Sequence, residues 1–187
     1  MGLAHDAAAA VGRTLSSIRA GEEKLVARRI VRGDVAILDV TSPDFHDWSP
    51  LPKWATGDAD GRGHAPTLVW NGVPANAKSI AVVCEDPDAP LPKPFVHWLV
   101  YGIHANVNAV GARVELPVRE GENSALRTGF TPAAPPPGHG LHHYYFQVFA
   151  LDRAIELEER AGREALVQAM RDYVVGYGQI IGTYERK

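Results

Sequence analysis

Two carboxylates, Asp86 and Asp88, stand among prolines in the segment Asp-Pro-Asp-Ala-Pro at 86–90. The prolines fix the backbone φ angle next to the acids, so the carboxylates are presented in a defined direction. The segment follows an apolar run at 79–84 that predicts a strand covered on both faces. An isolated acidic segment of this kind is most often a solvated turn. A functional role for these acids therefore requires further polar residues at the same strand end.

A histidine, His97, interrupts the apolar run 95–101. Because side chains alternate across a strand, we expect Phe95, His97, Leu99 and Tyr101 to share one face. A lone histidine in such a run is more often a hydrogen-bonded core residue than part of a site. Whether His97 belongs to a functional site depends on the residues that the fold places beside it.

A third polar group, His142 and Tyr144, begins the apolar run 142–151 and follows a segment rich in proline and glycine. Residues two apart on a strand point to the same face, so His143 points away from both. An imidazole and a phenol both donate hydrogen bonds, and a protonated imidazole adds positive charge. This pair is therefore suited to holding an anion.

Several motifs occur in an order that resembles the phosphatidylethanolamine-binding protein family, and in particular its bacterial branch, often called Raf-kinase-inhibitor-like. The resemblance runs from about Val35 to the C-terminus. It implies a β-rich α+β fold in which a large antiparallel sheet packs on a smaller sheet, with peripheral helices towards the N- and C-termini. The matching segments are 41–45, 70–75, 78–79, 86–90, 97–98, 138–144 and 181–184.

The resemblance also implies a pocket at one end of the sheet for a phosphate-, phosphoethanolamine- or carboxylate-like ligand, bound without catalysis and without a cofactor. It further implies a cis peptide bond at Ala89–Pro90, where the chain would bend to deliver the acids. The residues carried over as ligand-binding are Asp86, His97, His142, Tyr144 and the wall residue Pro136, with Asp88, Pro90 and Trp98 in support.

Two positions depart from the family pattern. His143 stands where the family usually has arginine, which removes a fixed charge and a bidentate donor. Since residue 143 is expected to face away from the pocket, the pocket should survive this change. Phe130 falls near a position where a tyrosine is common, so one hydroxyl is expected to be missing at the rim.

An acid in an anion pocket needs a partner, because a bare carboxylate would repel the ligand. We expect Asp86 to hydrogen-bond one imidazole, which favours the protonated ring and turns its second N–H toward the ligand. The remaining histidines are expected on loops or at the solvent side, and His139 is the one nearest to the predicted pocket mouth.

Three other classes of function compete with this interpretation. Two histidines and a carboxylate have the composition of a metal site, but no metal-binding spacing supports one. Covalent hydrolysis is disfavoured, since there is no Gly-x-Ser-x-Gly segment and Cys84 lies in an apolar strand. A protein-interaction regulator, such as a kinase or protease inhibitor, stays open as the alternative, because a relative's partner does not transfer with the fold.

Composition sets the wider limits. The 187 residues fit one domain, which we place at 31–187, after an N-terminal helical extension at 1–30. The net charge of −3 provides no basic surface for nucleic acid. A single cysteine, no signal-like N-terminus and no membrane-length apolar run predict a cytoplasmic protein.

The pattern of apolar residues predicts the elements around these motifs. A helix from Asp6 to about Ala20 could pack on its own domain or on a second copy of the chain as a homodimer, and the sequence does not distinguish the two. Two long irregular stretches, 41–66 and 110–141, are rich in proline and glycine and suggest functional loops. The predicted strands are 35–40, 67–70, 79–84, 95–101, 142–151 and 179–184, with a second helix at 163–174.

Overall fold

The computed structural model describes residues 2–58 and 63–187, with side chains from residue 6 onward. Residues 59–62, which belong to the predicted irregular stretch 41–66, lie outside this description. The elements in chain order are α1 Gly2–Leu15, η1 Glu22–Lys24, α2 Val26–Ile30, β1 Ala36–Ile37, β2 Asp39–Thr41, β3 Ser49–Pro50, η2 Lys53–Ala55, β4 Leu68–Asn71, β5 Ser79–Asp86, β6 Phe95–His104, β7 Ala109–Val110, β8 Arg119–Glu120, β9 His142–Leu151, α3 Arg163–Met170 and β10 Val174–Tyr184.

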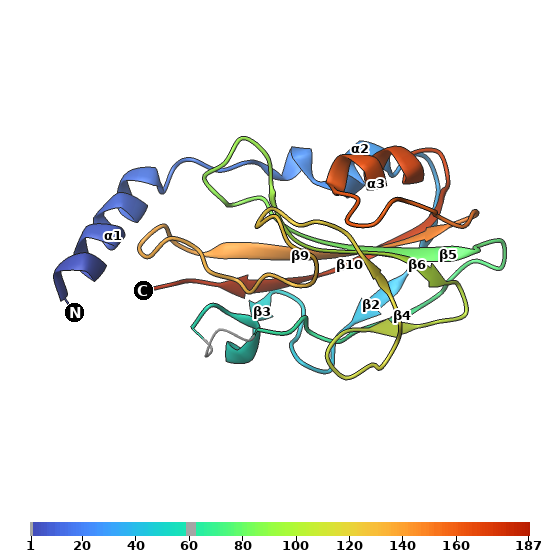
Figure 1. The fold of residues 1–187 in the computed structure, drawn as a ribbon, viewed down its shortest axis with the longest axis horizontal. Helices are drawn as coiled ribbons and strands as arrows, with labels where there is room; N and C mark the ends of the chain where they lie inside the picture. Colours follow the sequence, from blue (N-terminus) through green and yellow to red (C-terminus); the bar gives the residue numbers. More distant parts are fainter. Residues whose placement is uncertain (1, 59–62) are drawn as a thin grey trace.

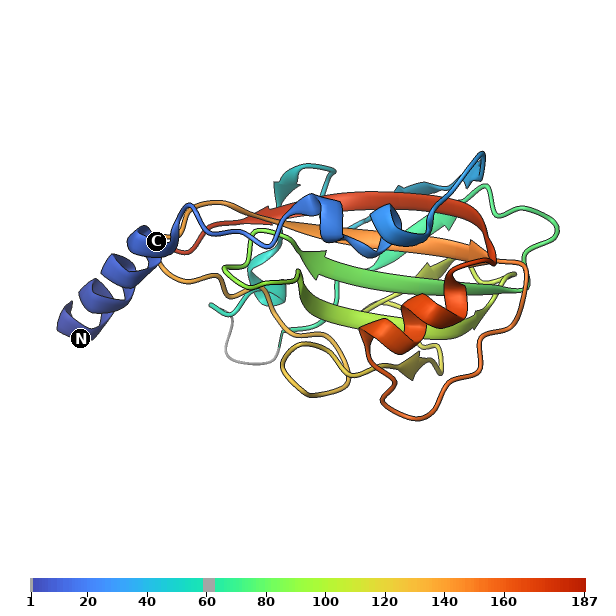
Figure 2. The same ribbon diagram turned by 90° about the horizontal axis from the view of Figure 1, so that it is seen from above.

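The described strands form two sheets, one large and one small (Figure 1). The larger sheet has the order β1-β10-β9-β5-β6-β8, with β3 also pairing with β10, and the smaller has the order β2-β4-β7. The long strands pair antiparallel, whereas the short strands β1 and β3 pair parallel with β10. Helices α2 and α3 cover the face of the larger sheet that points away from the smaller one (Figures 1 and 2). This architecture confirms the predicted fold class.

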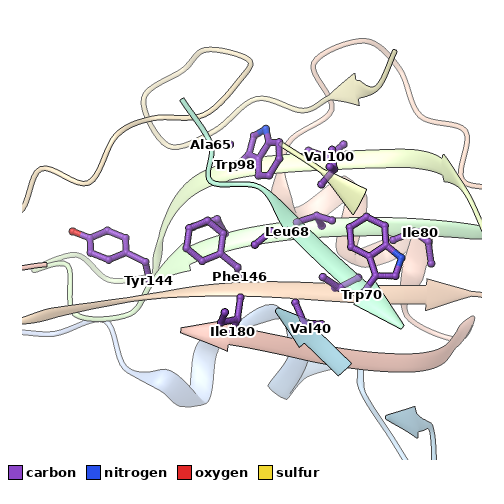
Figure 3. Close-up of a cluster of buried hydrophobic side chains, with 14 of the residues drawn as sticks. Val40, Ala65, Leu68, Trp70, Ile80, Trp98, Val100, Tyr144, Phe146 and Ile180 are labelled. Carbon is purple, nitrogen blue, oxygen red and sulfur yellow. The ribbon is translucent and has the colours of Figure 1, made fainter. Parts of the chain in front are cut away.

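Strand β5 is buried along its whole length because both of its faces are covered. Ile80, Val82 and Cys84 point into the core between the two sheets, where Trp70 and Phe146 also pack (Figure 3). Ala81 and Val83 point the other way, into the core beneath α2 and α3. The apolar run that predicted this strand is therefore explained by a core on each side.

A buried carboxylate, Glu85, ties the helical layer to the sheet. It is inaccessible to solvent and accepts hydrogen bonds from Arg163 Nε at 2.6 Å, from the Val26 amide at 2.8 Å and from Gln147 Nε2 at 2.8 Å. These partners come from α3, α2 and β9. The ion pair and the amide bonds satisfy a charge that would otherwise be costly to bury.

Some element boundaries differ from the prediction. Helix α1 begins at Gly2 and ends at Leu15, so Asp6 lies inside it and is not its cap. The predicted strand 35–40 is divided, because the chain passes from one sheet to the other at the buried Leu38: β1 pairs with β10 and β2 pairs with β4. Sequence periodicity cannot show such a change of partner. Helix α3 ends at Met170, and β10 begins at Val174.

Helix α1 projects from one end of the sheets, close to the C-terminus (Figure 2). The chain then runs back along the helical face of the large sheet. Residues of this run enter the core, since Val26, Ala27 and Ile30 belong to the cluster beneath α3. Of the helices in the described ranges, none is long and apolar enough to cross a membrane.

Candidate functional site

The acidic segment 86–90 leaves the end of β5. Asp86 continues the row of side chains that faces the smaller sheet, and it is 3% exposed. Its Oδ1 accepts the Asp88 amide at 2.8 Å, which closes a tight turn. The turn is held from outside by the N-terminal segment: the amides of Ala20 and Gly21 donate to the carbonyls of Ala89 and Pro87, both at 3.0 Å.

The predicted cis bond at Ala89–Pro90 is wrong, since no peptide bond among the described residues is cis. The bend is made instead with trans bonds and hydrogen bonds. Besides the two bonds from the N-terminal segment, the Leu91 amide donates to the Ala89 carbonyl at 2.8 Å. The N-terminal partners lie far away in sequence, so nothing in the local motif indicates them.

His97 lies in a β-bulge, and this corrects its predicted face. Along β5, Cys84 pairs with Trp98 and the next residue, Glu85, pairs with Val96, so His97 is the extra residue without an opposite partner. A bulge redirects a side chain and shifts the alternation. Leu99 packs under the helices, but the His97 ring lies against the ring of Tyr144, 5.1 Å between centroids, on the other side of the sheet. Leu99 and His97 therefore do not share a face.

One pocket of about 260 Å³ opens at this end of the sheet. Its wall combines a few polar groups with a largely apolar lining, and none of the described residues that line it is a lysine or an arginine. Of the predicted supporting residues, Trp98 lies elsewhere, in a separate hollow beside Phe130, and Asp88 is not on the wall. The lining residues are Asp86, Ala89, Pro90, Leu91, Phe95, His97, Thr131, Pro132, Ala134, Pro135, Pro136 and His142.

Tyr144, which was predicted to bind the ligand, is not among the residues that line this pocket, but its ring packs against that of the lining residue His97. Tyr144 is fully buried, and its hydroxyl has no hydrogen-bond partner among the described residues. Figure 3 shows the hydroxyl at the end of the row of core side chains, pointing away from Phe146. Burial, together with the charge of Asp86, raises the pKa of Tyr144 well above its usual value. The hydroxyl therefore keeps its proton and is an unused donor.

The predicted bond between Asp86 and an imidazole is present. His142 Nδ1 lies 2.7 Å from Asp86 Oδ2. The second half of that prediction is wrong, because His142 Nε2 does not face a ligand but lies 2.7 Å from His139 Nδ1. His139 in turn places Nε2 2.8 Å from the carbonyl oxygen of Leu15 at the end of α1.

His139 lies on a loop, as expected, but sequence reasoning missed its burial and its contact with His142. It is 1% exposed and sits between Gly138 and Gly140, which have φ angles of 75° and 102°. These left-handed conformations favour glycine and turn the loop sharply inward. The Gly-His-Gly sequence is the feature from which an inward turn at His139 could have been predicted.

The outer face of β9 carries a separate polar cluster. His143 donates its main-chain N–H to Asp88 Oδ2 at 2.7 Å and places Nδ1 2.8 Å from the same oxygen, while Arg19 forms an ion pair with Asp88 Oδ1. Burial raises the pKa of Asp88, but these hydrogen bonds and the Arg19 charge outweigh it and hold the pKa below its ordinary value. His143 therefore faces away from the pocket, as predicted, and helps to hold the acidic turn.

The ring nitrogens limit what the site can bind. His97 Nδ1 is 2.6 Å from the Thr131 carbonyl oxygen, and both nitrogens of His142 are engaged. Within the described ranges, no three His, Cys, Asp or Glu side chains are grouped as a metal site requires. Burial lowers the pKa of His97, against the opposing effect of the Asp86 charge. Among the described residues, the arrangement offers hydrogen-bonding groups in a pocket that is open at one end of the sheet.

Comparison with known proteins places this geometry in a family. The family model for phosphatidylethanolamine-binding protein matches residues 41–185. A relative from Methanothermobacter thermautotrophicus, named UPF0098 protein, is 36% identical over 149 residues, which cover 76% of this chain and 95% of the relative. A UPF0098 protein from Mycobacterium bovis is 31% identical over 184 residues, 95% of this chain and 78% of the relative.

Solved structures agree with the sequence matches. The Chlamydia trachomatis protein CT736, described as a phosphatidylethanolamine-binding protein homologue, superposes with a TM-score of 0.73 at 31% identity, covering 83% of this chain and 100% of that one. Escherichia coli YbcL, described as a member of the mammalian family, gives 0.71 at 30% identity over 80% of this chain and 99% of its own. The chain therefore belongs to the phosphatidylethanolamine-binding protein family, in the branch that includes YbcL.

Proposed function

We propose that this protein binds a small phosphate-, phosphoethanolamine- or carboxylate-like anion, without catalysis, in the pocket lined by Asp86, His97 and His142. The observation that carries the proposal is the Tyr144 hydroxyl, which is fully buried, protonated and without a partner. A buried unpaired donor costs about 1–3 kcal/mol, and an anionic oxygen would remove that cost. The family to which the chain belongs is named for binding a phosphate-containing head group.

The apolar lining supports binding without chemistry. Pro136, Pro90 and Phe95 shape the wall, and they exclude water without offering a nucleophile or a general base to a bound phosphate. Asp86 and His142 are bonded to each other, so the carboxylate is not presented alone to the ligand. The pocket volume of about 260 Å³ suits a single head group.

The direct test is a thermal-shift and calorimetric titration of the full chain with inorganic phosphate and with O-phosphoethanolamine, against potassium chloride at equal ionic strength. A ligand that binds only the folded state raises stability by about 2.7 kcal/mol at one hundred times its dissociation constant. We expect His142→Gln to weaken binding about tenfold, because it changes the pocket wall and the partner of Asp86.

The matched control is His143→Gln, one residue along the same strand but on the opposite face. It should bind phosphate as the parent does. If neither anion shifts the melting temperature at millimolar concentration, the proposal is wrong. Recovery of one stoichiometric protein partner under those conditions would then favour the regulatory alternative.

A further inference from the structure

The tautomer of His97 is fixed by its backbone partner. A carbonyl oxygen can only accept, so the 2.6 Å contact between His97 Nδ1 and the Thr131 carbonyl requires the proton on Nδ1. The Thr131 amide also donates to the His97 carbonyl at 2.8 Å, which locks the two residues together. In a neutral imidazole the other nitrogen is then a bare acceptor. His97 Nε2, with no partner among the described residues, thus offers a lone pair at the pocket wall.

We propose that the pocket selects a tetrahedral oxyanion that still carries a proton, such as hydrogen phosphate or a phosphate monoester, over sulfate, and that His97 Nε2 is the group that recognises this proton. The proposal rests on the anion-binding function above and narrows its ligand class. The ligand O–H donates to His97 Nε2, while another ligand oxygen accepts from the Tyr144 hydroxyl.

The other polar groups of the pocket favour the same ligand. Asp86 contributes acceptor oxygens, and its two oxygens already receive the Asp88 amide and His142 Nδ1. His142 has no N–H left for a ligand, since its Nε2 is bonded to His139. None of the described residues that line the wall is a lysine or an arginine. A fully deprotonated dianion would meet lone pairs and apolar carbon with little compensation for its lost hydration.

Protonation of His97 would reverse the selection, because Nε2 would become a donor. Burial lowers the pKa of His97, which keeps the ring neutral at neutral pH. The titratable groups that surround it are Asp86 at the end of β5, His142 and Tyr144 on β9, and the buried Cys84 beside Asp86. A positive charge, Arg127, lies beyond Thr131 and donates from Nε to the Thr131 hydroxyl at 3.3 Å.

The experiment compares inorganic phosphate, sulfate and ethanolamine as ligands for the full chain by calorimetry at about pH 6, where phosphate groups still carry a proton. We expect phosphate to bind at least about tenfold more tightly than sulfate, because a site that accepts a ligand hydroxyl rejects an analogue without it. Ethanolamine alone should not bind. Equal binding of phosphate and sulfate would overturn the proposal, although the pocket would still be an anion site. Binding of ethanolamine alone would also overturn it and would indicate an amine site.

His97→Leu supplies the residue-specific arm, because an aliphatic side chain removes the lone pair, whereas the amide oxygen of a glutamine would still accept the ligand proton. The phosphate-to-sulfate ratio should fall about tenfold in this variant and stay unchanged in His104→Leu, the same change at an exposed histidine at the far end of the same strand. An unchanged ratio in His97→Leu would contradict the assignment.

A ligand-free readout keeps the test independent of the binding result. Nitrogen-15 chemical shifts of His97 in the free protein should show the proton on Nδ1 and a bare Nε2. The opposite tautomer would overturn the inference. Absence of any phosphate binding would instead overturn the proposed function and the selectivity that rests on it.

Discussion

At the scale of single residues, the chemistry of the pocket depends on which ring nitrogen each histidine has free. The sequence indicates His97 and His142 as site residues, and the structure brings both to the wall beside Asp86. It cannot indicate the partners of their nitrogens, since Thr131 and Asp86 are far away along the chain. The residue types were therefore predictable, and their donor and acceptor roles were not.

Removal of the unpaired Tyr144 hydroxyl is expected to affect stability and phosphate affinity in different ways. Tyr144→Phe should leave the ligand-free protein as stable as the parent or more stable by about 1 kcal/mol, because it removes a buried donor that has no partner. The same variant should bind phosphate several-fold more weakly. Urea unfolding and calorimetry measure the two effects. Tyr145→Phe, the neighbour on the opposite face of β9, should leave phosphate affinity unchanged. A loss of stability with unaltered phosphate affinity in Tyr144→Phe would show that the Tyr144 hydroxyl does not bind the ligand.

Burial of His97 is expected to make the folded protein less stable at acid pH. Its pKa is lowered in the folded state, so the unfolded chain takes up the proton first as the pH falls. The free energy of unfolding is therefore not reduced by this residue above its unfolded pKa of about 6.5. Below that pH it decreases, by at most about 1.4 kcal/mol per pH unit. His97→Gln should flatten that decrease in urea unfolding, whereas His104→Gln should not. Equal slopes in the parent and His97→Gln would contradict the account.

At the scale of elements, apolar periodicity predicts the long strands β5, β6 and β9 and the helix α3. It does not predict the bulge at His97, because the bulge depends on how β6 pairs with β5. It also misses the division at Leu38, where two sheets share one run of residues. In both places the pairing partner decides the local structure.

The buried ion pair between α3 and β5 gives a test of how the helical layer is attached. Arg163→Met should destabilise the protein by about 3–5 kcal/mol, because it leaves the inaccessible Glu85 carboxylate without its charge partner. Arg160→Met, which removes an exposed pair with Glu122, should cost at most about 1 kcal/mol. Urea unfolding compares the two. Similar losses in both variants would show that the buried pair contributes no more than a surface one.

At the scale of the whole molecule, the N-terminal segment is joined to the pocket. A continuous chain of hydrogen bonds runs from the Leu15 carbonyl through His139 and His142 to Asp86. The family resemblance gave no counterpart for the first 30 residues, and this connection could not be predicted from them.

The attachment of α1 can be tested at Gly12. A methyl group there would overlap the Pro137 carbonyl oxygen of the pocket loop. Gly12→Ala should therefore detach α1 and speed hydrogen exchange of its amides, although alanine favours a helix by about 1 kcal/mol over glycine. Ala8→Val, at an exposed position of the same helix, should leave exchange close to that of the parent. Slower exchange in Gly12→Ala would show that the helix is not held at this contact.

The most direct test of the account is a crystal structure of the full chain grown with O-phosphoethanolamine at about pH 6. We expect a phosphate group in the pocket, with one oxygen within hydrogen-bonding distance of His97 Nε2 and another near the Tyr144 hydroxyl. A saturated crystal in which this pocket holds only water, or in which the phosphate lies at another surface, would contradict it.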